Sequence, residues 1–293
     1  MRILFAIPHY FAWTTAGNYA SERSTPEARA QTVRQCVASL LQTFSGAQGL
    51  MNGRTRQFHP ANPRLSAEVT IALCTTGENH LVPQLGLDCF DHIRTHAEPR
   101  FLGFECHKVL RNGLGQYDYF GYLEDDLRIV DGLFLAKLGW FGSQFGDAAV
   151  LQPNRFELID DPLPYKLYID GNMHDGRVSP SLQRIEEHRR IEVPAFGQSV
   201  VFQRIDNPHS GCFFLNPAQL ERWVQQREFA VPLSVFGGPL ESAATLGIMR
   251  HFRVYKPARE NAAFLEIEHL DRRYLGRHFW PAAGNPPYLV WDA

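Results

Sequence analysis

Three consecutive carboxylates, Glu124, Asp125 and Asp126, follow directly after the aromatic and apolar run Tyr117–Leu123. Such a run is typical of a buried strand. Adjacent carboxylates repel one another in a dry interior, so a cation must compensate their charge. Carboxylate oxygens are the ligands that Mg²⁺ and Mn²⁺ prefer. The cluster therefore predicts a site for a divalent cation with a polyanionic ligand.

The spacing of the acids predicts different roles for them. On an extended backbone Glu124 and Asp126 share one face, and Asp125 takes the other. One face is then free to ligate a metal while the other reaches a ribose hydroxyl. The alternative is a solvated turn whose acids cap a following helix. Two observations argue against this solvated turn: the preceding strand is too apolar for the edge of a sheet, and a helix cap needs fewer than three acids.

Apolar patterns along the chain alternate between strand and helix periods. The expected strands, besides the run before the acids, are Arg2–Ile7, Val69–Cys74, Ala148–Leu151, Cys212–Leu215 and Phe252–Tyr255. The expected helices are Thr25–Phe44, Glu105–Leu114, Leu133–Phe141, one capped by Asn216, and Glu241–Met249. This order predicts an α/β fold: a single domain with a mostly parallel central sheet flanked by helices. Ligands of such sheets bind beyond the carboxyl ends of the strands.

Composition narrows the class of protein. The chain has 293 residues, 44% of them hydrophobic, which is enough for a sizeable core. A net charge of -2 gives no general attraction for nucleic acid. No apolar run approaches the ~18 residues of a transmembrane segment. The 5 cysteines are odd in number and scattered, which favours reduced thiols and a cytoplasmic location. The polar segment Gly46–Pro63 is expected to be an exposed insertion.

The strand followed by Leu-Glu-Asp-Asp-Leu (123–127) resembles the metal motif of GT-A-fold glycosyltransferases, most closely the Glu-Asp-Asp of the N-acetylglucosaminyltransferase I type. The motif supports the resemblance over the first half of the chain, and the rest matches only by pattern. It implies transfer of a sugar from a nucleotide-sugar donor, by analogy a UDP-sugar, to a glycan or other hydroxyl acceptor, with Mn²⁺ or Mg²⁺. Residues 1–155 would bind the nucleotide and residues 156–293 the acceptor.

The resemblance also implies roles for individual residues. Asp126 would ligate the metal, Asp125 would face the ribose or sugar, and Glu124 would support both. His269 would be a further metal ligand supplied by a late loop, with His251 and His278 as rivals.

Glu241 follows the turn Gly237-Gly238-Pro239 and stands at the start of a helix, whose N-terminus favours the ionised carboxylate. The resemblance implies that it is the catalytic base of an inverting displacement; retention stays open. The plain alternative is a first-turn helix acid. Other candidates for the base are Asp206, Glu157 and Asp170.

A further set of residues is expected to bind the nucleotide sugar. Aromatic rings stack on bases, and guanidinium groups match phosphate oxygens. The set comprises Pro8, His9, Tyr10, Arg23, Thr76, Lys108, Arg111 and Arg273, with Glu124 and Asp125. For Lys108 and Arg111, three apart on one helix face, the alternative is a solvated pair.

Three other functions remain open. A GT-B transferase normally needs a longer chain and no acid triplet. A nucleotidyltransferase or phosphoesterase would use the same acids on a phosphate. A non-catalytic carbohydrate-binding protein would keep the fold without turnover.

Overall fold

The structure, a computed structural model, describes residues 1–13, 20–159, 164–171, 182–271 and 274. Its central sheet has the strand order β13-β6-β1-β4-β5. The strands are β1 (Arg2–Pro8), β4 (Glu68–Thr76), β5 (Asp91–Thr95), β6 (Tyr119–Leu123) and β13 (Cys212–Leu215). The β1/β4, β1/β6 and β4/β5 pairings are parallel and only β13 runs antiparallel to its neighbour, which confirms the mostly parallel sheet.

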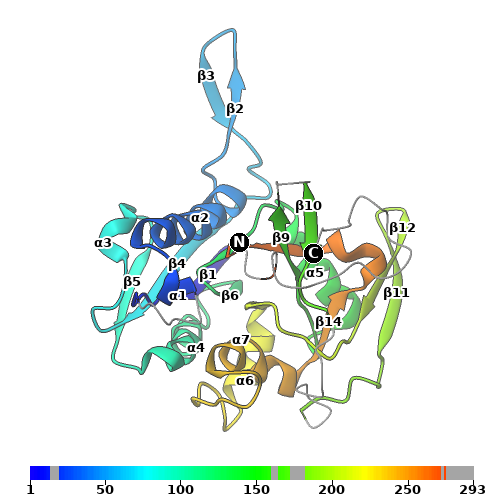
Figure 1. The fold of residues 1–293 in the computed structure, drawn as a ribbon. Coiled ribbons are helices and arrows are strands. Elements are labelled where there is room, and N and C mark those ends of the chain that lie inside the picture. Colours follow the sequence, from blue (N-terminus) through cyan, green and yellow to red (C-terminus); the bar gives the residue numbers. More distant parts are fainter. Residues whose placement is uncertain (14–19, 160–163, 172–181, 272–273, 275–293) are drawn as a thin grey trace, which may run out of the picture.

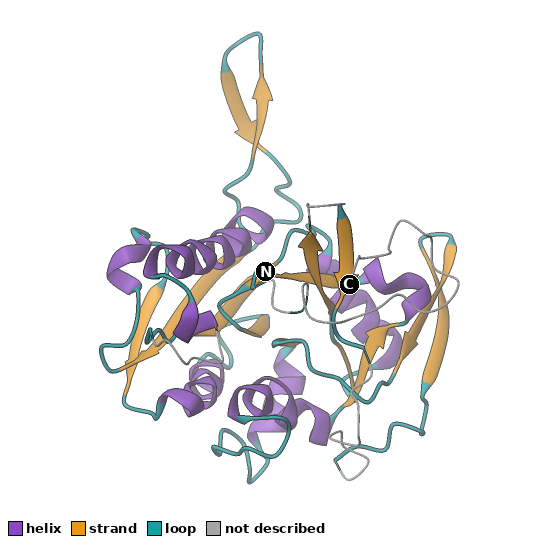
Figure 2. Ribbon diagram, viewed as in Figure 1, coloured by secondary structure: helices purple, strands orange, loops and turns teal. Residues whose placement is uncertain are grey.

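Helices cover both faces of this sheet (Figures 1 and 2). They are α2 (Pro26–Phe44), α4 (Leu102–Asn112), α5 (Phe134–Phe145), α6 (Pro217–Val224) and α7 (Pro239–His251). Because side chains alternate along a strand, β1 supplies both cores. Phe5 and Ile7 pack with α2 and α5, whereas Leu4 and Ala6 pack with α4, α6 and α7. The predicted α/β class is therefore confirmed.

Two smaller sheets lie beside the central one. The first has the order β10-β9-β15-β7; its strands are β7 (Leu127–Arg128), β9 (Asn154–Ile159), β10 (Tyr165–Tyr168) and β15 (Glu266–His269). The second has the order β11-β12-β14-β8; its strands are β8 (Ala149–Leu151), β11 (Arg190–Ala195), β12 (Gln198–Gln203) and β14 (Arg253–Pro257). β15 pairs with β7 so that His269 stands opposite Leu127, directly after the acids. The chain thus folds back on its own acid segment.

Two of the predicted helices have a capping side chain at their start, of which the sequence predicted only Asn216. Thr25 Oγ1 accepts a hydrogen bond from the Ala28 N–H, and Asn216 forms a capping box with Gln219. Several predicted helix bounds are wrong: the helix placed at Glu105–Leu114 runs from Leu102 to Asn112, that at Leu133–Phe141 from Phe134 to Phe145, and that at Glu241–Met249 from Pro239 to His251. The remaining helical turns are short: α1 (Ala20–Arg23), α3 (Val82–Leu85), and 3₁₀ turns at Pro99–Phe101 and Arg259–Phe264.

The expected exposed insertion contains a hairpin, β2 (Gly49–Asn52) and β3 (Gln57–Pro60), that the sequence pattern did not predict. All five cysteines are free thiols, and four of them are buried. Among the described residues, no helix combines the length and the apolar character needed to cross a bilayer.

Candidate functional site

The three acids lie where the chain turns between β6 and β7, at the carboxyl edge of the central sheet. Residues 125 and 126 form the turn, so the extended alternation expected for the acids is wrong: Asp125 and Asp126 both face Arg29. The helix-cap alternative is also wrong, because the next helix starts only at Phe134. Asp125 is 5% exposed, which makes the turn part of the interior.

Arg29, in the first turn of α2, compensates the charge of these acids. Its guanidinium contacts Asp125 Oδ1 and lies 3.5 Å from Asp126 Oδ2. Burial opposes the charge on Arg29, but Asp125, Asp126 and Asp271 outweigh burial and raise its pKa. Sequence reasoning missed this residue. The signal was its position four residues before Val33, on the apolar face of the helix, where an arginine needs a buried partner.

His9 holds Asp125 from the opposite side. The Leu81 N–H donates to His9 Nε2 at 2.9 Å, so Nδ1 carries the proton and donates to Asp125 Oδ2 at 2.6 Å. Burial raises the pKa of Asp125, but Arg29 and His9 together outweigh it and lower that pKa. Asp125 is thus an ionised carboxylate with both oxygens engaged. The structure brings the predicted residues His9 and Asp125 into direct contact.

Asp126, in the turn between β6 and β7, lies close to His269, the last residue of β15. Asp126 Oδ2 lies 4.0 Å from His269 Nε2, and Asp126 Oδ1 is buried without a hydrogen-bond partner among the described residues. His269 Nδ1 lies 2.8 Å from Glu157 Oε1, which orients Nε2 toward Asp126. The Leu270 N–H donates to the Asp126 carbonyl at 2.8 Å. Glu157, weighed as a base from the sequence, therefore acts as the support of His269.

This pair fits a divalent cation that is shared with a phosphate ligand. Within the described residues no group of three or more His, Cys, Asp or Glu side chains is placed to hold a metal by itself. A site with one carboxylate and one imidazole leaves further positions for phosphate oxygens and water, as Mg²⁺ and Mn²⁺ sites commonly do. The unpartnered Oδ1 of Asp126 is the atom that such a cation would satisfy. Of the rivals to His269, His251 contacts Glu228 at 3.0 Å instead, and His278 lies outside the described residues.

Glu124 faces the opposite way, toward Gly211 and Glu241. Burial raises its pKa to about 8; Asp126 and Glu241 add to that increase, and Arg155 opposes it. Gly211 has a φ of +63°, and a Cβ there would lie 2.5 Å from Glu124 Oε2, so a glycine is needed for both reasons. The carboxyl group is thereby confined against the backbone of the segment before β13.

Glu241 is the third residue of α7, as expected from the Gly237-Gly238-Pro239 turn. Its Oε2 is buried without a hydrogen-bond partner among the described residues. A Cβ on Gly238 would lie 2.7 Å from that oxygen, so the carboxyl group folds back over the turn that starts the helix. Glu241 influences the pKa of Glu124, which places the two glutamates in one region of the site.

A cluster of buried charged side chains, Asp170, Arg155 and Lys256, adjoins the site. Asp170 accepts from Arg155 Nε at 2.9 Å and from Lys256 Nζ at 2.7 Å. Burial raises the pKa of Asp170, but the two cations outweigh it and hold that pKa well below its usual range. Lys256 also donates to the His209 carbonyl at 2.6 Å. Asp170, another base candidate from the sequence, is therefore an anchor between β9, β14 and the segment before β13.

The other predicted nucleotide-binding residues separate into two groups. Pro8 ends β1 and Thr76 ends β4, so both lie at the same edge as the acids; Thr76 Oγ1 donates to the Ala97 carbonyl at 2.5 Å. Tyr10 is half-buried and packs against the core on the α4 side. For Arg23 only the backbone, in α1, is described, and Arg273 lies outside the described residues.

Lys108 and Arg111 are not brought to the acids. α4 links the carboxyl end of β5 to the start of β6, so it runs back across the sheet and its second half lies away from the acid edge. Lys108 pairs with Glu105 at 2.7 Å, and Arg111 is exposed. The solvated-pair alternative describes them, and the prediction that they meet the donor finds no support in their placement.

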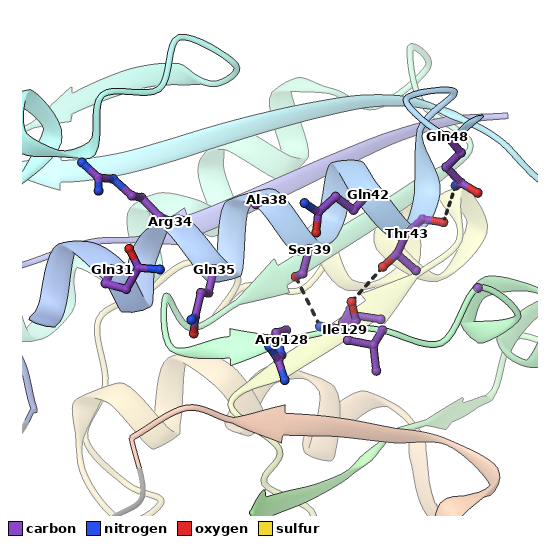
Figure 3. Close-up of a pocket in the computed structure, with 12 residues that line it drawn as sticks. Gln31, Arg34, Gln35, Ala38, Ser39, Gln42, Thr43, Gln48, Arg128 and Ile129 are labelled. Atoms are coloured by element: carbon purple, nitrogen blue, oxygen red, sulfur yellow. Dashed lines mark hydrogen bonds between the residues drawn. The ribbon is translucent and has the colours of Figure 1, made fainter. Parts of the chain in front are cut away.

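A cavity of about 530 Å³ runs along α2 beside β7 (Figure 3). None of the predicted site residues lines it. Two hydrogen bonds join residues that line the cavity: the Ile129 N–H donates to Ser39 Oγ at 3.3 Å, and Thr43 Oγ1 donates to the Ile129 carbonyl at 2.8 Å. These bonds tie α2 to the segment that follows the acids and so help to place Arg29 against them.

Comparison with known proteins found no matching family model and no matching curated protein. Among solved structures, GalNAc-T7 with UDP, GalNAc and Mn²⁺ has a TM-score of 0.49 and 11% identity over 92% of this chain. S. aureus TarS 1-349 in complex with UDP has a TM-score of 0.44 and 11% identity over 87% of this chain. The match covers 43% of the first of those chains and 57% of the second. Both comparisons concern the path of the backbone, and neither assigns an activity to this chain.

Proposed function

We propose that this protein is a metal-dependent glycosyltransferase that moves a sugar from a nucleotide-sugar donor to a hydroxyl acceptor. The observation that carries the proposal is the pair Asp126 and His269 at the carboxyl edge of the central sheet. Asp126 keeps a buried oxygen unpartnered among the described residues, and Glu157 orients His269 toward it. This is an arrangement suited to a cation that also binds a diphosphate.

Asp126 and His269 would hold Mg²⁺ or Mn²⁺, which when bound supplies Lewis-acid stabilisation of a departing diphosphate. Arg29, fixed by Asp125 and Asp126, adds a permanent positive charge at the same place. His9 and Asp125 are hydrogen-bonded to each other beyond the ends of β1 and β6. The donor ribose and base would lie there, beside Tyr10. A UDP-sugar remains the expected donor.

Glu241 is the proposed base. The acceptor oxygen attacks the anomeric carbon and forms the new glycosidic bond, the bond to the diphosphate breaks, and the acceptor proton passes to Glu241. The buried Oε2 of Glu241 at the start of α7 suits this task, because it has no hydrogen-bond partner among the described residues and is available to take a proton. Direct displacement of this kind inverts the anomeric configuration.

The test combines a thermal-shift panel with a transfer assay. Nucleotide sugars are added with and without Mn²⁺, and one donor together with the metal should raise Tm by about 4 °C at 100 times its Kd. Asp126→Asn should lose that shift. Glu241→Gln should keep the shift but lose about 10²–10⁴-fold in transfer rate. Asp118→Asn, which removes a half-exposed carboxylate at the opposite end of β6, is the matched control and should change neither.

Two results would contradict the proposal. One is the absence of a metal-dependent shift with every nucleotide sugar tested. The other is release of pyrophosphate or phosphate without sugar transfer, which would assign the acids to a nucleotidyltransferase or phosphoesterase.

A further inference from the structure

The hairpin β2–β3 projects from the body of the protein (Figures 1 and 2). Its two strands pair with each other and with no other strand of the described chain. Asn52 Oδ1 accepts from the N–H groups of Arg54 and Thr55 at 3.1 and 3.3 Å, so the tip has a defined turn. An isolated two-stranded hairpin is only marginally stable in water, so its exposed side chains need a stabilising environment elsewhere.

The hairpin exposes large apolar side chains on both faces. Leu50, Met51 and Phe58 are 70%, 80% and 78% exposed. Met51 stands opposite Phe58, while Leu50 stands opposite His59 on the other face. Phe58 lies over Gly49, where a Cβ would come within 2.8 Å of its ring. Apolar side chains gathered on one projecting element mark a surface that meets a partner.

The same element is basic. Arg54 and Arg56 occupy the tip and Arg64 follows the hairpin, all three exposed and without an ion pair to any described residue. No Asp or Glu occurs between Glu27 and Glu68, although the whole chain carries a net charge of -2. Exposed apolar side chains on the two strands, with arginines at the tip between them, complement a surface that is anionic outside and apolar beneath.

We infer that the β2–β3 hairpin docks this protein on an anionic lipid surface. Arg54 and Arg56 bind lipid phosphates, which the planar guanidinium matches well. Leu50, Met51 and Phe58 insert between the headgroups, where their apolar area leaves water. The inference rests on residues outside the acid site and stands independently of the transfer reaction.

The position of the hairpin leaves the acids accessible. Arg29 lies in the first turn of α2, and the hairpin follows the other end of that helix. A 19-residue helix is about 28 Å long. A bilayer against the hairpin therefore does not cover Asp125 and Asp126, so docking variants should leave transfer to a water-soluble acceptor unchanged.

The test is sedimentation of the full chain with vesicles of equal parts phosphatidylglycerol and phosphatidylcholine, or of phosphatidylcholine alone. Binding to the anionic vesicles should exceed binding to the neutral ones and weaken with salt. Arg54→Gln with Arg56→Gln should lower affinity about 30-fold, from about fivefold per arginine. Met51→Asn with Phe58→Asn should abolish binding. The control Phe196→Asn, at a phenylalanine that is 74% exposed elsewhere, should bind as the unaltered protein does.

Three outcomes would overturn the inference. The first is equal binding to neutral and anionic vesicles, or no binding to either. The second is an equal loss of binding from Phe196→Asn and from the hairpin variants. The third is a concentration-dependent dimer that the Met51→Asn, Phe58→Asn variant loses, which would assign the hairpin to a second copy of this chain. Circular dichroism and thermal unfolding monitor the fold of each variant, and the substituted side chains lie outside the core.

Discussion

Replacing Arg29 with methionine tests the electrostatic account of the site most directly. The guanidinium is almost fully buried and is the cation that contacts both Asp125 and Asp126. Methionine keeps the length and the apolar contacts of the stem but removes the charge. Two carboxylates, with Asp271 nearby, then remain in a region of low dielectric with less compensation.

The expected loss in the free energy of unfolding follows from the burial of Arg29 and its two carboxylate partners. The side chains of Arg29, Asp125 and Asp126 are 5%, 7% and 15% exposed, so the ion pairs between them are buried. Removing one partner of a buried pair costs about 3–5 kcal/mol. Unfolding of a 293-residue chain carries an entropy of about 0.6 kcal/mol/K. The melting temperature of Arg29→Met should therefore fall by about 5–8 °C.

A double-mutant cycle isolates the interaction from the general effect of the substitution. Urea unfolding is measured for the unaltered protein, Arg29→Met, Asp125→Asn and the combination. The combination should be less destabilised than the sum of the single variants by about 0.5–3 kcal/mol. Arg34→Met is the matched control on the same helix, because within the described residues Arg34 donates only to the carbonyls of Gln84 and Leu85. It should cost about 1 kcal/mol.

Additive effects of the two substitutions would refute the reasoning. So would an Arg29→Met variant no less stable than Arg34→Met. Either result would mean that water or protonation, rather than the guanidinium, compensates the two carboxylates.

Two further predictions concern other parts of the site and the core. Gly211→Ala should cost at least about 1 kcal/mol more in urea unfolding than Gly115→Ala, because both glycines have positive φ but only at 211 does a Cβ meet Glu124; equal costs would contradict the contact. Burial lowers the pKa of His107 to about 4, so below about pH 6.5 the unfolded chain binds a proton that the folded protein does not. Stability from this group is therefore complete above pH 6.5 and falls by about 2 kcal/mol on acidification to pH 5. His107→Leu should show a correspondingly smaller difference in urea unfolding between pH 7 and pH 5, and an unchanged difference would refute the assignment.

Local signals in the sequence were enough for the elements that carry the acids. The strand Cys212–Leu215 has the predicted bounds, α2 begins within one residue of the predicted start at Thr25, and α6 begins after the predicted cap Asn216. Each of these features depends on residues within one or two turns of chain, such as an apolar run, a proline in the first turn or a capping side chain. Strands such as β9 and β12 were missed because each pairs with a distant segment of the chain, β9 with β15 and β12 with β14.

The residue types at the site were also visible in the sequence, but their partners were not. Asp126, His269 and Glu241 attract attention because carboxylates and imidazoles stand beside turns and strand ends. Lys108 and Arg111 have equally suitable side chains, but the direction of α4 places them away from the acids.

The sequence by itself determined that three acids end a buried strand and therefore need compensation, since that requirement follows from adjacent residues alone. Only the tertiary structure decided which groups compensate the charge of these acids. Arg29 lies 96 positions from Asp125, and Glu157 lies 112 positions from His269. Backbone preferences are set by chain neighbours, whereas charge compensation in a low-dielectric interior is set by neighbours in space.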